Sequence, residues 1–383
     1  MEWKEVRLGD VCTRVCSGGT PKSTNLSYYG GEIPWLNTKE IDFNRIYSTE
    51  KTITDSGLNN SSAKWIVPNT VTVAMYGATA GKSCIVKVPM TTNQACCNLT
   101  INDEVADYEF VYYSLKNDYT TLASLANGGA QQNLNAQIIK DYVLKMPSLA
   151  DQRRIASILS SLDRKIELNN KINADLEEMA QAIFKNWFVD FEPFKDGKFV
   201  DSELGMIPEG WKVGRLGELC NFKRGKNLLT KNAIDEGVPV VAGGLEPSCY
   251  HNVANTGAPV ITVSGSGANA GFMRMYHVPV WASDCSFIDI SCENFYFVYC
   301  FLKVNSKLLK HAQTGAVQPH VKPSDIHDFE LVIPDKESIY DFQDKVKPFF
   351  DKIAAIQKEN SRLSLLRDTL LPRLMSGELE VPE

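Results

Sequence analysis

From Leu149 to Trp187 the chain reads LADQRRIASILSSLDRKIELNNKINADLEEMAQAIFKNW. Neither glycine nor proline occurs between Leu149 and Phe191, so no residue in this stretch interrupts a helix. Apolar residues recur at heptad spacing and predict a long helix with one apolar stripe, formed by Leu159, Leu162, Ile166, Leu176, Ala180, Ile183 and Trp187. A single helix cannot bury such a stripe by itself, so a partner is required.

A second stretch after Pro334 has the same pattern and is the obvious partner. Its stripe consists of Val346, Phe349, Ile353, Ile356, Leu363, Leu370 and Leu374. Pro348 lies in its early turns, where a proline can kink a helix. At 1.5 Å per residue, a helix of this size is roughly 55–60 Å long.

Both stripes are interrupted at the same place, by Asn173 and Asn360. A polar residue in a helix–helix seam costs stability but fixes register and partner orientation. The two asparagines are therefore predicted to set the helix register. The alternative is that both are solvated side chains at slipped positions.

The chain is an internal repeat. WKEVRLGDVC at Trp3 returns as WKVGRLGELC at Trp211, and GATAG at Gly77 returns as GANAG at Gly267. A repeat of this kind means that one structural unit is used twice.

The distance between the copies locates an insertion. From Phe110, which matches Phe297, the offset stays at 297 − 110 = 187 residues into the helices, whereas at the N-terminus it is 211 − 3 = 208. The first copy therefore holds 208 − 187 = 21 additional residues, mostly between Gly18 and Trp65.

Each copy is a globular segment followed by a helical one. Short β-branched runs at 70–73 and 259–263, broken by turn residues, predict strands, and a helix is expected over 108–125 and over 295–312. This predicts an α+β fold. The expected organisation is two repeated globular domains at 1–147 and 211–334, long helices at 148–192 and 335–383, and a polar linker at 193–210.

Composition excludes some classes of protein. The 383 residues hold 40 Lys plus Arg against 46 Asp plus Glu, a formal charge of −6, which excludes a strongly basic, histone-like binder. The globular segments carry 13 − 14 = −1 and 11 − 10 = +1, so the acidity lies in the helices and linker. No apolar run approaches the ~20 residues that span a bilayer, and the N-terminus lacks a signal pattern, so we expect a cytoplasmic protein.

The motifs predict neither a metal site nor a catalytic one. Ten cysteines without a C-x-x-C pair favour reduced, buried thiols over structural zinc. GATAGKS at Gly77 has three residues between its glycines, where a phosphate-binding P-loop needs four. We find no nuclease, methyltransferase, H-E-x-x-H or G-x-S-x-G pattern, and all five His lie in the second copy, whereas a duplicated enzyme would repeat its catalytic residues.

What recurs in both copies is a set of polar loops. Residues 17–22 correspond to 223–226, the two glycine turns correspond, and 127–133 correspond to 314–320. Their side chains are of the types that read base edges and hold phosphates. The candidate DNA-binding residues are Thr20, Lys22, Tyr76, Thr79, Lys82, Gln131, Asn133, Lys223, Arg224, Lys226, Ser266, Asn269, Gln318 and His320. The alternative is a set of ordinary polar turns.

Three further candidates lie on a predicted helix. Lys303, Lys307 and Lys310 have, with His311, the spacing of one helix face. Such a face suits contacts with DNA phosphates, and the alternative is an ordinary solvated face.

Taken in order, the motifs resemble those of the specificity (S) subunits of type I restriction–modification systems, over essentially the whole chain. They are W-K-x-x-x-L-G at Trp3 and Trp211, SGGTPKS at Ser17, GGEIPWLNTKEI at Gly30, GATAGK at Gly77, MPSLADQRRIASILSSLDRKIELNN at Met146, NWFVDFEPF at Asn186, GAVQPHV at Gly315 and LLPRLMSGEL at Leu370. Several are weak singly, but their order and their repetition are specific.

The resemblance implies that each globular segment is a target recognition domain that reads one half of a split, asymmetric sequence in double-stranded DNA. It implies that the two helices pack antiparallel as a coiled-coil spacer with pseudo-two-fold symmetry and dock two methyltransferase (M) subunits. Those subunits would hold S-adenosylmethionine, and restriction (R) subunits would add cleavage. This chain would then bind no cofactor and catalyse nothing.

The two copies depart from each other in one loop, which has Gln131-Gln132-Asn133 in the first and Gln318-Pro319-His320 in the second. This puts in doubt whether both loops contact DNA in the same way. The competing hypotheses are a pair of catalytic domains such as a nuclease, a coiled-coil scaffold that binds only protein, and an orphan DNA-binding S subunit.

Overall fold

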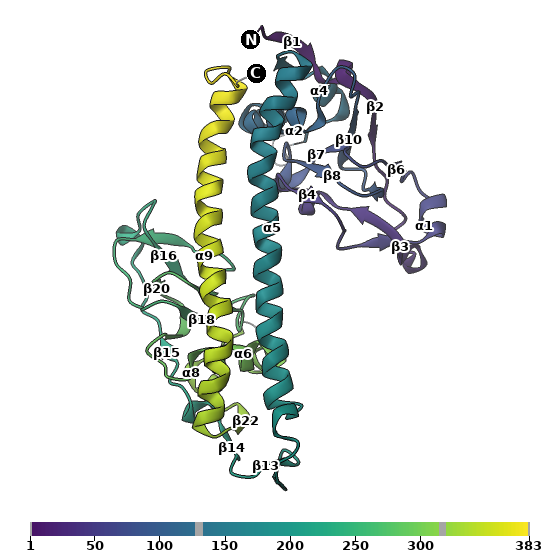
Figure 1. The fold of residues 1–383 in the computed structure, drawn as a ribbon. Coiled ribbons are helices and arrows are strands. Elements are labelled where there is room, and N and C mark those ends of the chain that lie inside the picture. The colour runs from purple at the N-terminus through teal and green to yellow at the C-terminus, as the bar shows by residue number, and fades with distance from the viewer. Residues whose placement is uncertain (1, 127–132, 314–318, 382–383) are drawn as a thin grey trace. The chain divides into compact units, whose positions relative to one another are not determined.

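The computed structural model describes residues 2–126, 133–313 and 319–381, which form two compact units (Figure 1). Unit 1 is Met1–Glu167 with Asn360–Glu383, and unit 2 is Leu168–Glu359. Each unit therefore combines one globular segment with a part of both long helices.

The long helices are α5, Leu149–Phe188, and α9, Lys336–Met375, with 40 residues each. This confirms the two predicted helices, and α9 continues through Pro348. Every residue of the predicted stripes is buried or partly buried. Within unit 2, Asn169 bonds to Glu359 and Phe184 packs on Phe342, so the helix segments run antiparallel there.

Unit 1 contains two sheets of short strands. One has the order β2-β10-β7-β8-β4, with β2 Cys12–Ser17, β10 Cys96–Ile101, β7 Val71–Ala74, β8 Ser83–Val86 and β4 Arg45–Ile46. The other has the order β5-β3-β9-β6, with β5 Thr52–Ile53, β3 Tyr29–Leu36, β9 Met90–Thr92 and β6 Trp65–Ile66. A separate pair joins β1, Lys4–Arg7, to β11, Val143–Met146. The short helices are α1 Asp55–Asn59, α2 Tyr108–Asn117, α3 Tyr119–Ser124 and α4 Ala136–Asp141.

Unit 2 repeats the main part of this topology. Its larger sheet has the order β15-β21-β18-β19, with β15 Lys223–Arg224, β21 Cys285–Asp289, β18 Val260–Ser264 and β19 Met273–Tyr276. The smaller sheet joins β17 Cys249–His251, β16 Val238–Val241 and β20 Trp281–Ala282, and β14 Lys212–Arg215 pairs with β22 Glu330–Ile333. The hairpin β12 Phe199–Val200 and β13 Ile207–Pro208 lies in the predicted linker, and the short helices are α6 Phe295–Val304, α7 Ser306–His311 and α8 Pro323–His327.

The comparison of the two units locates the insertion. In both copies this part of the chain contains one matching strand, β3 in the first and β16 in the second. Between β2 and β7 the first copy also has α1, β4, β5 and β6. Within the described residues between β15 and β18, the second copy also has the strand β17 and no other additional strand. This confirms the predicted position of the additional residues.

Two predicted helices are each broken in two. The helix expected over 108–125 ends at Asn117 and restarts at Tyr119, and the one expected over 295–312 ends at Val304 and restarts at Ser306. At the second break, the side-chain amide of Asn305 donates to the Phe301 carbonyl at 2.9 Å, the same oxygen that accepts from its backbone N–H. Asn and Asp compete in this way with the helical hydrogen bonds, and the apolar pattern does not reveal it.

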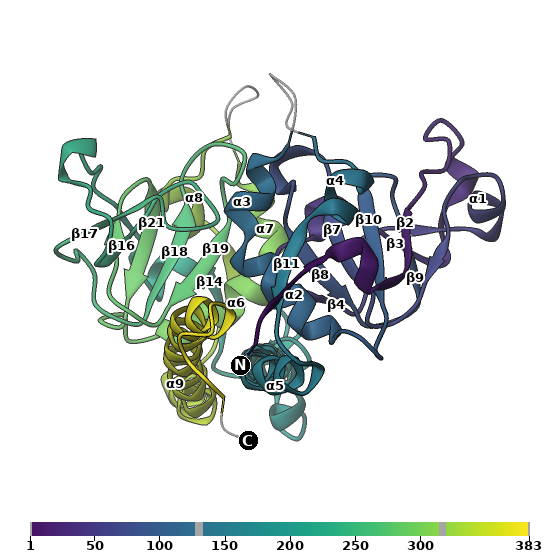
Figure 2. The same cartoon turned by 90° about the horizontal axis from the view of Figure 1, so that it is seen from above.

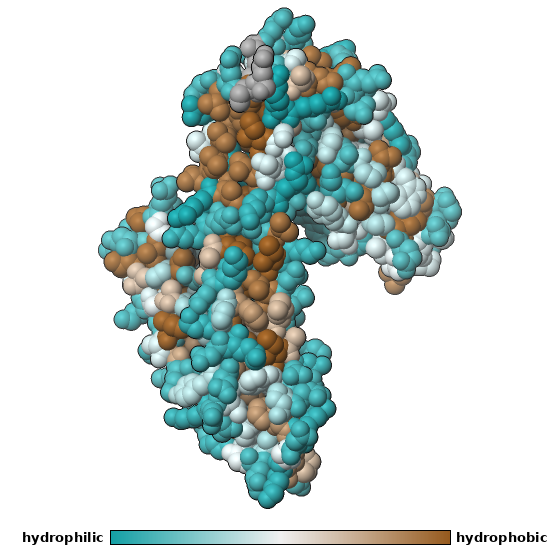
Figure 3. Space-filling model, viewed as in Figure 1, coloured by the Kyte–Doolittle hydropathy of each residue, from teal (hydrophilic) through white to brown (hydrophobic). Residues whose placement is uncertain are grey.

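The long helices complete the core of each unit. In unit 1 the sheet and α2 enclose Ile155 and Leu159 of α5 with Leu374 of α9, and in unit 2 α6 packs on both helices (Figure 2). On the face drawn in Figure 3 hydrophobic residues lie in small groups among hydrophilic ones. Within the described ranges, no helix is long and apolar enough to cross a bilayer.

Candidate nucleic-acid interface

Three of the predicted loop segments meet in unit 1. The backbone N–H of Gly19 donates to the Thr92 carbonyl at 2.9 Å, and Tyr76 forms a bridge with Asn133. The hydroxyl of Thr20 donates to Gln94, a residue that sequence patterns did not single out. We name residues 17–22, 75–82, 92–95 and 133–134 loop cluster 1.

The corresponding segments meet in unit 2. Lys226 donates its backbone N–H to the Ala282 carbonyl at 2.9 Å, and Ser266 forms a bridge with His320. The side chains of Arg224 and Ser266 both bond to Asp284. We name residues 223–227, 264–271, 282–284 and 319–321 loop cluster 2.

Both clusters use glycine where the backbone passes close to a neighbouring segment or adopts a positive φ angle. A Cβ atom on Gly18 would lie 2.1 Å from the Thr92 carbonyl oxygen, and one on Gly225 would lie 2.1 Å from that of Ser283. Gly77 and Gly267 have φ angles of +76° and +80°, which favour glycine. The same backbone path is therefore built in both clusters.

The candidate residues differ in how free their side chains are. Lys22, Lys223 and Lys226 are exposed, and Tyr76 is 39% exposed. Other candidates bond within the chain, namely Lys82 to Asp42 at 2.5 Å, Thr79 to the Thr38 carbonyl at 3.0 Å and Asn269 to the Gly243 carbonyl at 3.4 Å. The carbonyl oxygen of the Asn133 side chain is buried without a hydrogen-bond partner. Gln131 and Gln318 lie outside the described residues.

The three lysines of the predicted helix face lie on two separate helices. The break at Asn305 places Lys303 on α6 but Lys307 and Lys310 on α7. Lys303 pairs with Glu177 of α5, Nζ to Oε1 2.9 Å, and its side chain is 30% exposed. This ammonium therefore ties α6 to α5, whereas Lys307 and Lys310 are exposed, and contact of the three lysines with DNA phosphates stays a prediction.

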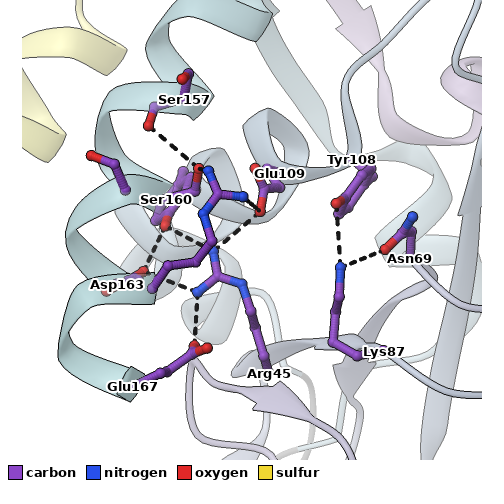
Figure 4. Close-up of polar contacts among 12 residues, drawn as sticks. Arg45, Asn69, Lys87, Tyr108, Glu109, Ser157, Ser160, Asp163 and Glu167 are labelled. Atoms are coloured by element: carbon purple, nitrogen blue, oxygen red, sulfur yellow. Dashed lines mark hydrogen bonds and ion pairs between the residues drawn. The ribbon is translucent and has the colours of Figure 1, made fainter. Parts of the chain in front are cut away.

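Sequence patterns missed Arg45, which joins the globular part of unit 1 to α5 (Figure 4). Its side chain is 3% exposed and contacts Glu109 at 3.2 Å and Glu167 at 2.9 Å. Asp163 lies 3.9 Å from Arg45 and accepts a 2.6 Å hydrogen bond from Tyr113. Burial alone would lower the pKa of Arg45, but Tyr113 and Glu167 raise it above its ordinary value, so the guanidinium stays charged.

The same network reaches α9 within unit 1. Arg367 Nη1 lies 2.8 Å from Asp163 Oδ1. At the repeat position of Asp163, offset by 187, unit 2 has Phe350, which stacks on Tyr296 with ring centroids 5.0 Å apart. At this matched position the helices are thus tied to the globular segment by ions in unit 1 and by aromatic rings in unit 2.

The predicted register residues are half-buried. The Oδ1 atom of Asn173 is buried without a hydrogen-bond partner, and Asn360 lies in the other unit. A third asparagine, Asn169, is 1% exposed and donates to Glu359 at 2.8 Å. It belongs to the seam of unit 2 and occupies a heptad position of the stripe, seven residues after Leu162 and seven before Leu176.

Within the described ranges, no group of three or more His, Cys, Asp or Glu residues is arranged to hold a metal ion. All ten cysteines are free thiols. Burial raises the pKa of Cys97 to about 12, which keeps this thiol protonated at neutral pH.

Comparisons with known proteins agree on one family. Residues 1–178 and 208–364 match the family described as "Type I restriction modification DNA specificity domain". The chain is 31% identical to the type I restriction enzyme MjaIX specificity subunit of Methanocaldococcus jannaschii over 411 aligned residues, which cover 100% of this chain and 94% of that protein. It is 26% identical to the HindI specificity subunit of Haemophilus influenzae, over 71% of this chain and 77% of that one.

The fold is also found in a solved structure. The crystal structure of the type I restriction–modification S subunit from M. genitalium superposes with a TM-score of 0.59 at 20% identity, covering 98% of this chain and 96% of that one. The two matched segments, together with a relative that is 31% identical over the whole chain, show that this chain belongs to the family of type I restriction–modification DNA specificity subunits.

Proposed function

We propose that this chain selects the DNA sequence for a type I restriction–modification enzyme, with each loop cluster reading one half of a bipartite, asymmetric site. The observation that carries the proposal is that one strand framework presents two clusters with different side chains, for instance Thr20 with Gln94 in cluster 1 and Arg224 with Asp284 in cluster 2. Such clusters are similar in shape and different in hydrogen-bonding pattern, as two base readers require.

The proposed partners supply the remaining functions. Two methyltransferase subunits would dock on the chain, hold S-adenosylmethionine and transfer the methyl group, and restriction subunits would cleave. Large apolar side chains left exposed on α5 and α9 support protein docking there: Leu168, Met179, Leu365 and Leu366. This chain would contribute no catalytic group and no cofactor.

Footprinting and a methylation assay test this proposal. The complex with its methyltransferase subunits should protect two short DNA segments separated by unread base pairs, and this chain alone should transfer no methyl group. A single continuous footprint, or methyl transfer by the isolated chain, would refute the proposal. A complex that assembles but protects no DNA would favour the scaffold alternative.

A further inference from the structure

The two loop clusters place different side chains at the same point of the strand framework. Ser17 of β2 is paired with Cys97 of β10, and Arg224 of β15 is paired with Ser286 of β21. Because β2-β10 and β15-β21 are matching strand pairs, Ser17 and Arg224 occupy equivalent positions.

Two further positions are matched by backbone hydrogen bonds. The N–H of Met75 donates to the Ala95 carbonyl at 2.8 Å, and the N–H of Gly265 donates to the Asp284 carbonyl at 3.1 Å. Met75 therefore corresponds to Gly265, and Ala95 corresponds to Asp284.

In cluster 2 these positions combine into one arrangement. Arg224 Nη2 donates to Asp284 Oδ1, and the Ser266 hydroxyl donates to Asp284 Oδ2. A Cβ atom on Gly265 would lie 2.0 Å from Arg224 Nη1, so a larger residue at this position would displace the guanidinium from its place beside Asp284. The Arg224 side chain is still 45% exposed and that of Asp284 31%.

Cluster 1 has none of these features. Met75, at the position of Gly265, is 2% exposed and packs in the core of unit 1, and neither Ser17 nor Ala95 carries a charge. Three coordinated differences between two otherwise similar turns indicate a feature that belongs to one reader only.

We propose that Arg224 is the base-reading side chain of unit 2, that it recognises a guanine in the major groove, and that Asp284 is its positioning residue; this rests on the function proposed above. Arginine donates two parallel hydrogen bonds to the O6 and N7 atoms of guanine, the commonest specific contact with a base. A carboxylate behind the guanidinium fixes its plane, so less side-chain entropy is lost on binding.

The carboxylate also separates base reading from phosphate binding. The charge of Arg224 is balanced by Asp284, so the pair adds little to the sequence-independent attraction of DNA. The guanidinium N–H groups of Arg224 remain able to distinguish one base pair from another.

The test compares variants of the full chain, each in complex with the methyltransferase subunits, on the cognate site and on its single-base-pair variants. Arg224→Lys keeps the charge but removes the planar fork, and Asp284→Asn removes the positioning carboxylate. The control is Glu246→Gln, which removes a carboxylate that also pairs with an arginine of unit 2, Arg274, at 3.0 Å. Affinity, its salt dependence and the thermal midpoint are measured for each.

Both Arg224→Lys and Asp284→Asn should reduce discrimination at the same G·C pair, by about 5- to 150-fold. The other half-site and the thermal midpoint should stay unchanged. The salt slope should stay unchanged in Arg224→Lys and become steeper in Asp284→Asn, whose arginine is no longer balanced by a carboxylate. Glu246→Gln should discriminate like the parent. Equal weakening on every sequence, or unchanged discrimination in Arg224→Lys, would overturn the assignment. A parent complex that protects no split site would instead refute the proposed function.

Discussion

At the scale of single residues, Arg45 illustrates how the chain uses buried charge. It brings a cation to Glu109, Asp163 and Glu167, which lie in or beside the core of unit 1. A buried ion pair contributes little net stability compared with apolar packing, but the loss of one partner leaves the others uncompensated.

Replacing Arg45 with Met should therefore lower the stability of unit 1 by about 3–5 kcal/mol. Urea unfolding followed by circular dichroism should show the loss as a lower midpoint for one of two transitions. The matched control is Lys39→Ala, since Lys39 and Glu50 form an ion pair in the same unit with both side chains more than half exposed. The control should unfold like the parent. An unchanged midpoint in Arg45→Met would mean that the network does not hold the unit together.

At the scale of elements, the break between α6 and α7 bears on which lysines are exposed for contact with DNA phosphates. Lys303 is engaged with Glu177 and lies 5.6 Å from the Tyr299 ring centroid, whereas Lys307 and Lys310 are exposed.

Changing Lys307 and Lys310 together to Ala should weaken DNA binding by the complex on all sequences alike. If both contact phosphates, the slope of log K against log salt should fall in magnitude by about 1.8, from ~0.9 for each contact. Lys303→Met should keep the slope but lower the thermal midpoint, because Glu177 loses its ammonium partner. A changed slope in Lys303→Met, with no change in the double variant, would reverse this assignment.

The seam of the long helices gives a second test at this scale. Asn173→Leu removes a buried carbonyl oxygen that has no hydrogen-bond partner and should stabilise the chain by about 1 kcal/mol. Asn169→Leu removes the donor to Glu359 and should destabilise it. Thermal unfolding of both variants decides the matter, and a marked fall in the midpoint of Asn173→Leu would show that its amide is needed for register.

At the scale of the whole molecule, periodicity and repetition predicted the two long helices, the duplicated α+β segments and the position of the insertion. They did not predict contacts between distant positions, because those depend on three-dimensional pairing. The indole N–H of Trp35 donates to the Gly19 carbonyl in cluster 1, while that of Trp281 donates to the Lys226 carbonyl in cluster 2. Trp35 lies on β3, which pairs with β9, whereas Trp281 lies on β20, which pairs with β16. Because β3 corresponds to β16 and not to β20, the two tryptophans are not at matching positions of the repeat, and no sequence offset aligns them.

The candidate site was predictable to a similar extent. The glycine turns that recur in both copies indicated the positions of both loop clusters. Turns of the same kind at matching positions mean that the backbone follows the same course in each copy. The partner of Arg224 was not predictable, because Asp284 is 284 − 224 = 60 residues away and has an alanine at its place in the first copy. The helix break at Asn305 was hidden for the opposite reason, since it arises from one local side-chain bond within an apolar pattern.

The central claim is that two units of one chain read two separated parts of a DNA sequence. The most direct measurement is the genomic methylation pattern of the source organism with and without this gene. The account predicts that methylation at one asymmetric motif, made of two short specified parts around a fixed unspecified gap, disappears when the gene is removed. Unchanged methylation, or the loss of a single continuous motif, would contradict it.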